Sequence, residues 1–132
     1  MANTGLLKKI LVVDDDHGFC NLIAETLRTE GYDTQQVYTG EDALIAYERD
    51  RPTLILLDVA MPGISGFEVA TSIRDQEQDT ENKTLIVIMS AHASTFAVSV
   101  RFHTGISHYL TKPISPRDVV TQVRNLVPLN NH

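Results

Sequence analysis

Three short, uninterrupted apolar runs constrain the fold of this chain more than any other feature. They cover residues 10–13, 54–57 and 85–89. Continuous apolar runs of this length are typical of strands that are buried on both faces at the centre of a parallel sheet. A more polar run at 34–38 and a short run at 108–110 suit the two edges of such a sheet. The sequence therefore predicts one sheet of five strands.

Amphipathic stretches with helical spacing lie between these runs. The apolar positions that follow this spacing are Phe19, Leu22, Ile23, Thr26 and Leu27; Ala43, Leu44 and Tyr47; Phe67, Ala70 and Ile73; and Val119, Val123 and Leu126. Gly31 closes the first stretch. Ser115 can cap the last one, with Pro116 at its first position and Asp118 where a capping-box acid would stand. Alternating strands and helices predict a doubly wound α/β fold, whose ligands bind beyond the carboxyl ends of the strands.

Polar residues with chemical potential occur at these predicted strand ends. They are Asp14, Asp15 and Asp16 after the first strand, Asp58 at the end of the third, Ser90 at the end of the fourth and Lys112 after the fifth. Because the first and third strands of a doubly wound sheet can be neighbours, Asp14, Asp15 and Asp58 are expected to converge. Crowded carboxylates repel each other, so a proton or a cation must relieve the repulsion. An all-oxygen ligand set favours Mg²⁺ over zinc.

A carboxylate, a hydroxyl, an ammonium and a divalent cation are the groups needed to move a phosphoryl group. Asp58 can act as the nucleophile, Lys112 can neutralise charge on the phosphoryl oxygens, and Ser90 can donate a hydrogen bond to the new group. Each residue alone has an ordinary alternative, such as helix capping, a turn or simple solvation. Those alternatives do not explain why the residues stand together at the ends of successive buried strands.

The composition of the chain limits which binding partners and which cellular compartment are expected. The chain has 11 Lys and Arg against 17 Asp and Glu, with a formal charge of -6, which argues against direct contact with nucleic acid or an anionic membrane. No signal peptide and no membrane-spanning run are present, so we expect a cytoplasmic protein. The single cysteine, Cys20, fits a buried small apolar residue better than a reactive thiol. The 132 residues of the chain suit one domain over 8–127, followed by a C-terminal tail at 128–132. Residues 75–83 are expected to form a polar loop without chemistry.

Four segments together resemble the receiver domain of bacterial two-component response regulators. They are 10–16 (ILVVDDD), 58–66 (DVAMPGISG), 90–91 (SA) and 109–113 (YLTKP), and the similarity runs from Lys9 to Val127. The resemblance implies a flavodoxin-like sheet with strand order 2-1-3-4-5 and five helices. It also implies a phosphoryl group taken from a phosphohistidine on a sensor histidine kinase or a histidine phosphotransfer protein.

The resemblance assigns roles to individual residues. It makes Asp58 the acceptor and places Mg²⁺ on Asp15, Asp58 and the backbone carbonyl of Ala60, with Asp14 holding ligands or waters. Ser90 stands at the position of the family's switch hydroxyl. Tyr109 stands at the position of an aromatic residue that, in the family, turns inward when the switch hydroxyl moves. The alternative role for Tyr109 is that of an ordinary aromatic residue in an edge strand. Phosphorylation would then repack the face formed by the fourth helix, the fifth strand and the last helix, which a downstream protein reads.

Four further features of the sequence carry weaker expectations. Ala60 and His92 lie where the family tunes loss of the phosphoryl group; small Ala60 should leave the path of water open, while His92 is best interpreted as a solvated loop residue. The apolar segment 94–105 suggests either a partner-docking helix or a well-buried one. The last helix lacks the charge pattern of regulators that dimerise through it.

Two other function classes compete with this one. A magnesium-dependent phosphohydrolase would need a general acid, and Ala60 stands where a second acid would be expected. A phosphorylation-independent binding module would not require the full polar set. We therefore expect a signalling module, not an enzyme acting on other substrates, and use as a stand-alone regulator or a relay.

Overall fold

The computed structural model describes residues 8–78, 81–91 and 105–129. Within these residues it contains the following strands and helices. They are β1 (Lys9–Val13), α1 (His17–Thr29), β2 (Asp33–Val37), α2 (Gly40–Asp50), β3 (Leu54–Asp58), α3 (Gly66–Gln76), β4 (Leu85–Ser90), β5 (His108–Thr111) and α5 (Pro116–Leu126). No helix among the described residues is long and apolar enough to cross a lipid bilayer.

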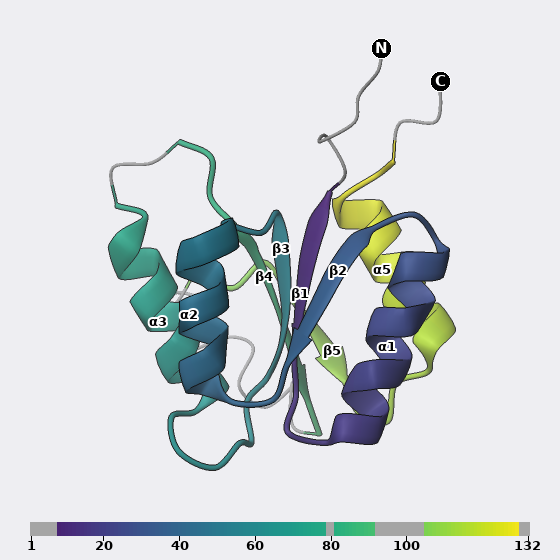
Figure 1. Cartoon of the computed structure of the whole chain (residues 1–132), viewed down its shortest axis with the longest axis horizontal. Helices are drawn as coiled ribbons and strands as arrows, with labels where there is room; N and C mark the ends of the chain where they lie inside the picture. The colour runs from purple at the N-terminus through teal and green to yellow at the C-terminus, as the bar shows by residue number, and fades with distance from the viewer. Residues whose placement is uncertain (1–7, 79–80, 92–104, 130–132) are drawn as a thin grey trace.

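The five strands form one parallel sheet in the order β2-β1-β3-β4-β5, as predicted. Figure 1 shows α2 and α3 on one face of the sheet and α1 and α5 on the other. The apolar strands β1, β3 and β4 are central, whereas the polar β2 and the short β5 form the edges. This placement follows from burial, because a central strand is covered on both faces and an edge strand is not.

Alternate residues of each central strand feed two separate cores. Ile10 and Val12 of β1 pack toward α1 and α5, whereas Leu11 and Val13 pack toward α2 and α3. Every residue of β3 is buried. The continuous apolar runs in the sequence are therefore explained by two-sided burial with a period of two residues.

Side chains cap the helices at their amino ends. Ser115 accepts a hydrogen bond from the backbone N–H of Asp118, and α5 begins at Pro116, as predicted. A reciprocal capping box occurs at α3, where the Glu68 carboxylate accepts from the N–H of Ser65 and the Ser65 hydroxyl accepts from the N–H of Glu68. This box fixes where α3 starts, directly after the loop that follows β3.

The predicted apolar face of the first helix was partly wrong. Leu22 is 51% exposed. The buried stripe of α1 consists of Cys20, Ile23, Ala24 and Leu27. These four residues have the i, i+3, i+4, i+7 spacing of one helix face, and Leu22 lies on the opposite side of the helix, facing solvent. The buried setting predicted for Cys20 is confirmed, and burial together with Asp14 raises the pKa of its thiol to about 12.

Four helices lie within the described residues, against five predicted. The remaining predicted helix, the fourth along the chain, would fall between β4 and β5, in residues 92–104, which lie outside the described residues. His92 and nearly all of the suggested docking segment at 94–105 fall there too. Of that segment the structure describes Gly105, which has a φ of 65° and whose carbonyl accepts two hydrogen bonds from Arg74.

The expectation of a loop without chemistry at 75–83 missed a buried carboxylate. Glu77 is 2% exposed and directly follows α3. Its side chain accepts hydrogen bonds from the Tyr47 hydroxyl at 2.7 Å and the Thr84 N–H at 3.0 Å, and it pairs with Arg74 at 2.6 Å. The Lys83 ammonium donates to the Glu77 carbonyl at 2.6 Å. Glu77 thus ties α2, α3 and the start of β4 together.

Residues beyond α5 also contribute to packing. Leu129 lies against the core beneath α1 and α5, within the segment expected to be a tail. The buried hydroxyl of Tyr32 donates to the carbonyl of Val127 at 2.7 Å. The structure therefore continues as packed chain at least as far as Leu129.

Candidate functional site

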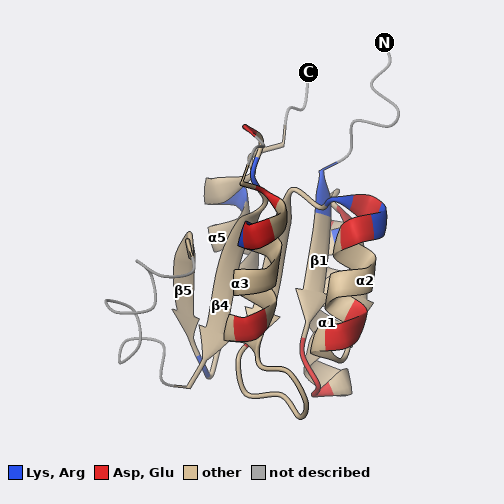
Figure 2. Cartoon of the chain, turned by 90° about the vertical axis from the view of Figure 1, so that its left-hand side faces the viewer, with Lys and Arg blue, Asp and Glu red and all other residues tan. Residues whose placement is uncertain are grey.

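Three carboxylates meet at the carboxyl end of the sheet. Asp14 follows β1 and Asp58 ends β3, and these strands are neighbours. Asp14, Asp15 and Asp58 each offer an oxygen within 4.8 Å of the oxygens offered by the other two. Asp14 and Asp58 are buried, whereas Asp15 is exposed. Figure 2 shows the acidic stretch in red where the chain leaves β1. The convergence expected from the sequence is therefore present.

An ammonium group bridges the two buried carboxylates. Lys112 follows β5, and its Nζ lies 2.9 Å from Oδ2 of Asp14 and 3.3 Å from Oδ1 of Asp58. Burial alone lowers the pKa of Lys112, but its contacts with Asp14 and Asp58 outweigh burial and leave that pKa raised. Lys112 therefore remains a cation at neutral pH and places a fixed positive charge beside Asp58.

The carboxyl group of Asp58 is unusually easy to protonate. Burial, followed by repulsion from Asp14, raises its pKa from 3.8 to about 6, against the opposing effects of Lys112 and a hydrogen bond from the Ala60 backbone. Above this pH the group is an anion in a poorly solvated site. A carboxylate whose negative charge is only partly compensated is suited to bind a cation or to attack an electrophile.

The structure also describes the predicted site residues Ser90, Ala60 and Tyr109. Ser90 ends β4 and is 4% exposed, and its backbone carbonyl accepts a hydrogen bond from the N–H of Lys112 at 2.9 Å. Ala60 is exposed in the loop after β3. Tyr109 lies in β5, partly buried, and packs on the core between the sheet and the α2 and α3 helices. Asp58 is in register with Met89, the residue before Ser90.

Asp16 has a structural role in this structure. Its carboxylate accepts from the N–H of Phe19 at 3.1 Å and so caps α1. Its own N–H donates to Oδ1 of Asp14 at 3.0 Å. The helix-capping alternative considered for the acidic triplet is thus correct for Asp16, and this cap also orients Asp14.

The loop after β3 is held by a glycine that the sequence patterns did not single out. A Cβ on Gly66 would lie 2.4 Å from the carbonyl oxygen of Asp58 and 2.9 Å from Cα of Val59. Both contacts are with backbone, so the clash can be relieved only by moving the helix or the strand. The absence of a side chain at Gly66 therefore lets α3 begin against the strand that carries Asp58.

Replacing Gly66 with alanine is expected to lower the free energy of unfolding by about 2 kcal/mol, because overpacking outweighs the better helix propensity of alanine. Urea unfolding followed by circular dichroism would measure this. Gly18→Ala is the matched control, since its Cβ would meet only Asp16 Oδ1, at 3.6 Å. That variant is expected to gain up to about 0.5 kcal/mol. Equal stability of the two variants would contradict the tight contact.

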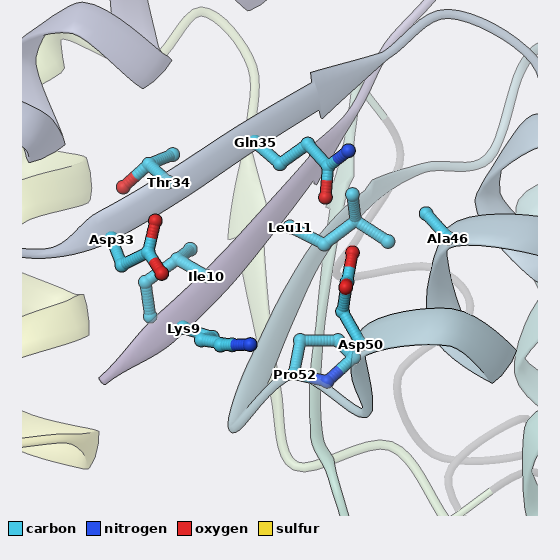
Figure 3. Close-up of a pocket in the computed structure, with 9 residues that line it drawn as sticks. All are labelled: Lys9, Ile10, Leu11, Asp33, Thr34, Gln35, Ala46, Asp50 and Pro52. Carbon is cyan, nitrogen blue, oxygen red and sulfur yellow. The ribbon is translucent and has the colours of Figure 1, made fainter. Parts of the chain in front are cut away.

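A separate cavity of about 270 Å³ lies at the other end of β1 and β2. Figure 3 shows Lys9 and Asp50 at this cavity, with Gln35 and Leu11 beside them. Its lining mixes positive and negative side chains over an apolar floor, so it does not select one charge of ligand. The cavity lies at the end of β1 opposite to the carboxylates, and we assign it no role.

A family comparison agrees with this geometry. Residues 10–124 match the model of the response regulator receiver domain. The chain belongs to the response regulator receiver family. Receiver domains are signalling modules of two-component systems and interact with kinases and with downstream targets. The resemblance drawn from the four sequence segments is thus confirmed at the level of the family.

Curated and solved relatives give the same result. The DNA-binding response regulator MtrA of Mycobacterium tuberculosis is 35% identical over 117 residues, which cover 89% of this chain and 49% of MtrA. The chain spans about half the length of the curated relatives it matches. The chemotaxis response regulator CheY4 of Vibrio cholerae has a TM-score of 0.82 and 26% identity, covering 92% of this chain and 99% of CheY4. Because MtrA binds DNA, the expectation of no direct nucleic-acid contact stays a prediction.

The receiver site has the donor set that Mg²⁺ prefers. Its three carboxylates supply only oxygen ligands, and their crowding leaves negative charge for a cation to neutralise. The response regulator TrrA of Thermotoga maritima was solved in complex with Mg²⁺-BeF; it has a TM-score of 0.77 and 31% identity, covering 92% of this chain and 100% of TrrA. The residues present therefore fit a magnesium site.

Proposed function

We propose that this receiver takes a phosphoryl group onto Asp58 from a phosphohistidine of a sensor histidine kinase or a histidine phosphotransfer protein. The observation that carries the proposal is the position of Asp58: it is 4% exposed, has Lys112 Nζ at 3.3 Å from its Oδ1, and belongs to the cluster with Asp14 and Asp15. This arrangement suits a nucleophile, because the Lys112 ammonium is already placed to neutralise the negative charge of the phosphoryl group that Asp58 would receive.

In the proposed step, a carboxylate oxygen of Asp58 attacks phosphorus and forms a P–O bond. The P–N bond to the donor imidazole breaks, and the imidazole keeps the electron pair. Lys112 supplies positive charge to the phosphoryl oxygens, which it can reach because it already bridges Asp14 and Asp58. The protein thus catalyses only its own phosphorylation and dephosphorylation.

The proposed ligands of Mg²⁺ are Asp14, Asp15, Asp58 and the backbone carbonyl of Ala60. When bound, the ion would neutralise charge on the phosphoryl oxygens. Exposed Asp15 keeps this side of the cluster open to solvent, which suits an ion that retains several waters. The small side chain of Ala60 leaves access for water, and His92 remains a further proposed position for tuning the lifetime of the phosphoryl group.

The proposed switch links Ser90 and Tyr109. The Ser90 hydroxyl would donate a hydrogen bond to the phosphoryl group, and the Tyr109 ring would repack in response. Ser90 lies on β4 and Tyr109 lies on β5, and these two strands are paired. A bond that exists in only one state shifts the population toward that state. The face of the fourth helix, β5 and α5 would then present a different surface to a downstream protein.

The acceptor is tested by intact-protein mass spectrometry after incubation with acetyl phosphate and Mg²⁺. We expect one phosphoryl adduct on the wild type and none on Asp58→Asn or after chelation of the metal. Asp33→Asn, which changes an exposed carboxylate of β2, should retain the adduct. An adduct that persists in Asp58→Asn would overturn the assignment, as would no adduct from either acetyl phosphate or a phosphohistidine donor protein.

A further inference from the structure

We infer that Phe19 is a positioning residue that holds the Lys112 ammonium over the acidic cluster. The inference rests on the proposed role of Lys112 and adds a residue to it. Phe19 lies in the first turn of α1, where the sequence pattern assigned it only to an apolar helix face. Lys112 Nζ lies over its ring, 5.1 Å from the ring centroid.

The contact has the geometry of a cation–π interaction. An ammonium within about 6 Å of an aromatic centroid is attracted by the negative face of the ring. The same Nζ contacts Asp14 and Asp58, so the two carboxylates and the ring surround the cation from different elements of the fold. A leucine at position 19 would fill similar space but would offer no such face.

Open space beside Lys112 would allow its side chain to move, and the contact with Phe19 opposes that movement. A cavity of about 410 Å³ borders Lys112 and is lined also by Asp16, Phe19, Ala91, Pro113 and Ile114. The Lys112 side chain is 28% exposed. Its flexible four-carbon stem therefore has room to carry the ammonium away from Asp14 and Asp58. The ring at the wall of this cavity favours the position over the cluster.

A closed set of contacts fixes the ring itself. The Asp16 carboxylate accepts from the N–H of Phe19, the N–H of Asp16 donates to Asp14, and Asp14 accepts from Lys112. The ammonium of Lys112 in turn contacts the Phe19 ring, which closes the set. Phe19 also packs against the core beneath α1. The first turn of α1 thus aligns both the ring and one carboxylate with the ammonium.

The test compares initial rates of phosphorylation by acetyl phosphate at saturating Mg²⁺. Phe19→Leu is expected to slow the reaction by about 2-fold to about 30-fold, the range that a cation–π contact supports. Phe19→Tyr keeps an aromatic face and is expected to restore a rate near that of the wild type. Phe67→Leu is the matched control, because Phe67 packs against the core on the opposite face of the sheet.

A spectroscopic readout separates this inference from the acceptor assignment. The ring should shift the NMR signal of the Lys112 ε-methylene upfield in the wild type and in Phe19→Tyr, and the shift should vanish in Phe19→Leu. This holds whether or not Asp58 is phosphorylated. Equal rates of the wild type and Phe19→Leu, equal slowing by leucine and tyrosine, or no ring-dependent NMR shift would overturn the inference. Loss of the adduct in all proteins would instead count against the proposed function.

Discussion

Replacing Glu77 with glutamine is expected to lower the free energy of unfolding by about 3 kcal/mol. Glutamine has nearly the same shape but lacks the negative charge of the carboxylate. That carboxylate pairs with Arg74 and accepts hydrogen bonds from the Tyr47 hydroxyl and the Thr84 N–H. Breaking a buried ion pair by changing one partner is strongly destabilising, and the Tyr47 hydroxyl and the Arg74 guanidinium would both lose a charged acceptor. Urea unfolding at pH 7 would measure the loss.

The pH dependence gives this prediction a sign. Burial raises the pKa of Glu77, but hydrogen bonds from Thr84, Tyr47 and Arg74 outweigh burial and leave that pKa below its ordinary value of 4.5. The carboxylate therefore contributes stability above pH 4.5, and this contribution is lost as the pH falls through the lowered pKa. The stability gap between wild type and Glu77→Gln should narrow in acid.

Asp75→Asn provides the control for Glu77. Asp75 is an exposed residue on the last turn of the same helix. Changing it should alter the free energy of unfolding by less than about 0.5 kcal/mol. A loss for Glu77→Gln no larger than that of Asp75→Asn would show that the network does not stabilise the fold.

The opposite effect is expected at the proposed acceptor: in metal-free buffer, Asp58→Asn should raise the free energy of unfolding at pH 8 by up to about 3 kcal/mol. The pKa of Asp58 is raised from 3.8 to about 6, chiefly by burial and by Asp14. Between these two values the folded state binds the proton more tightly than the unfolded state. Wild-type stability therefore falls as the pH rises through this window, and asparagine removes that loss.

Urea unfolding in EDTA at pH 4 and pH 8 would measure this gain. The two proteins should be closest in stability near pH 4, where Asp58 is largely protonated in the folded wild type, and should diverge by pH 8. Asp33→Asn serves again as a control, because Asp33 is an exposed carboxylate outside the cluster. A destabilised Asp58→Asn at pH 8 would mean that the contact with Lys112 outweighs burial and repulsion from Asp14.

These two carboxylates show how burial is used differently at the two ends of the sheet. Glu77 receives enough hydrogen bonds to make its buried charge stabilising. Asp58 is buried beside another carboxylate, and among the described residues the Lys112 ammonium contacts both. The first arrangement fixes α2, α3 and β4 in place. The second leaves the Asp58 carboxylate with a charge that is only partly compensated, at the expense of local stability.

Much of the fold and the candidate site could be predicted from local sequence patterns. The apolar runs identified the central strands because two-sided burial demands continuous apolar residues. Strand ends then placed Asp14, Asp58, Ser90 and Lys112 on one edge of the sheet, since parallel strands share a carboxyl end. These inferences needed only the direction of the chain and the periodicity of burial.

Tertiary structure alone decided the features that depend on contacts between distant segments. Leu22 has the spacing of a buried residue but is exposed, because α1 turns its Cys20, Ile23, Ala24 and Leu27 face to the core. Glu77 looked like a loop residue, and only folding brings Tyr47 and Thr84 to it. The ring of Phe19 meets Lys112 across 93 positions of sequence for the same reason. Local patterns encode which residues are buried, whereas three-dimensional packing decides what each buried group touches.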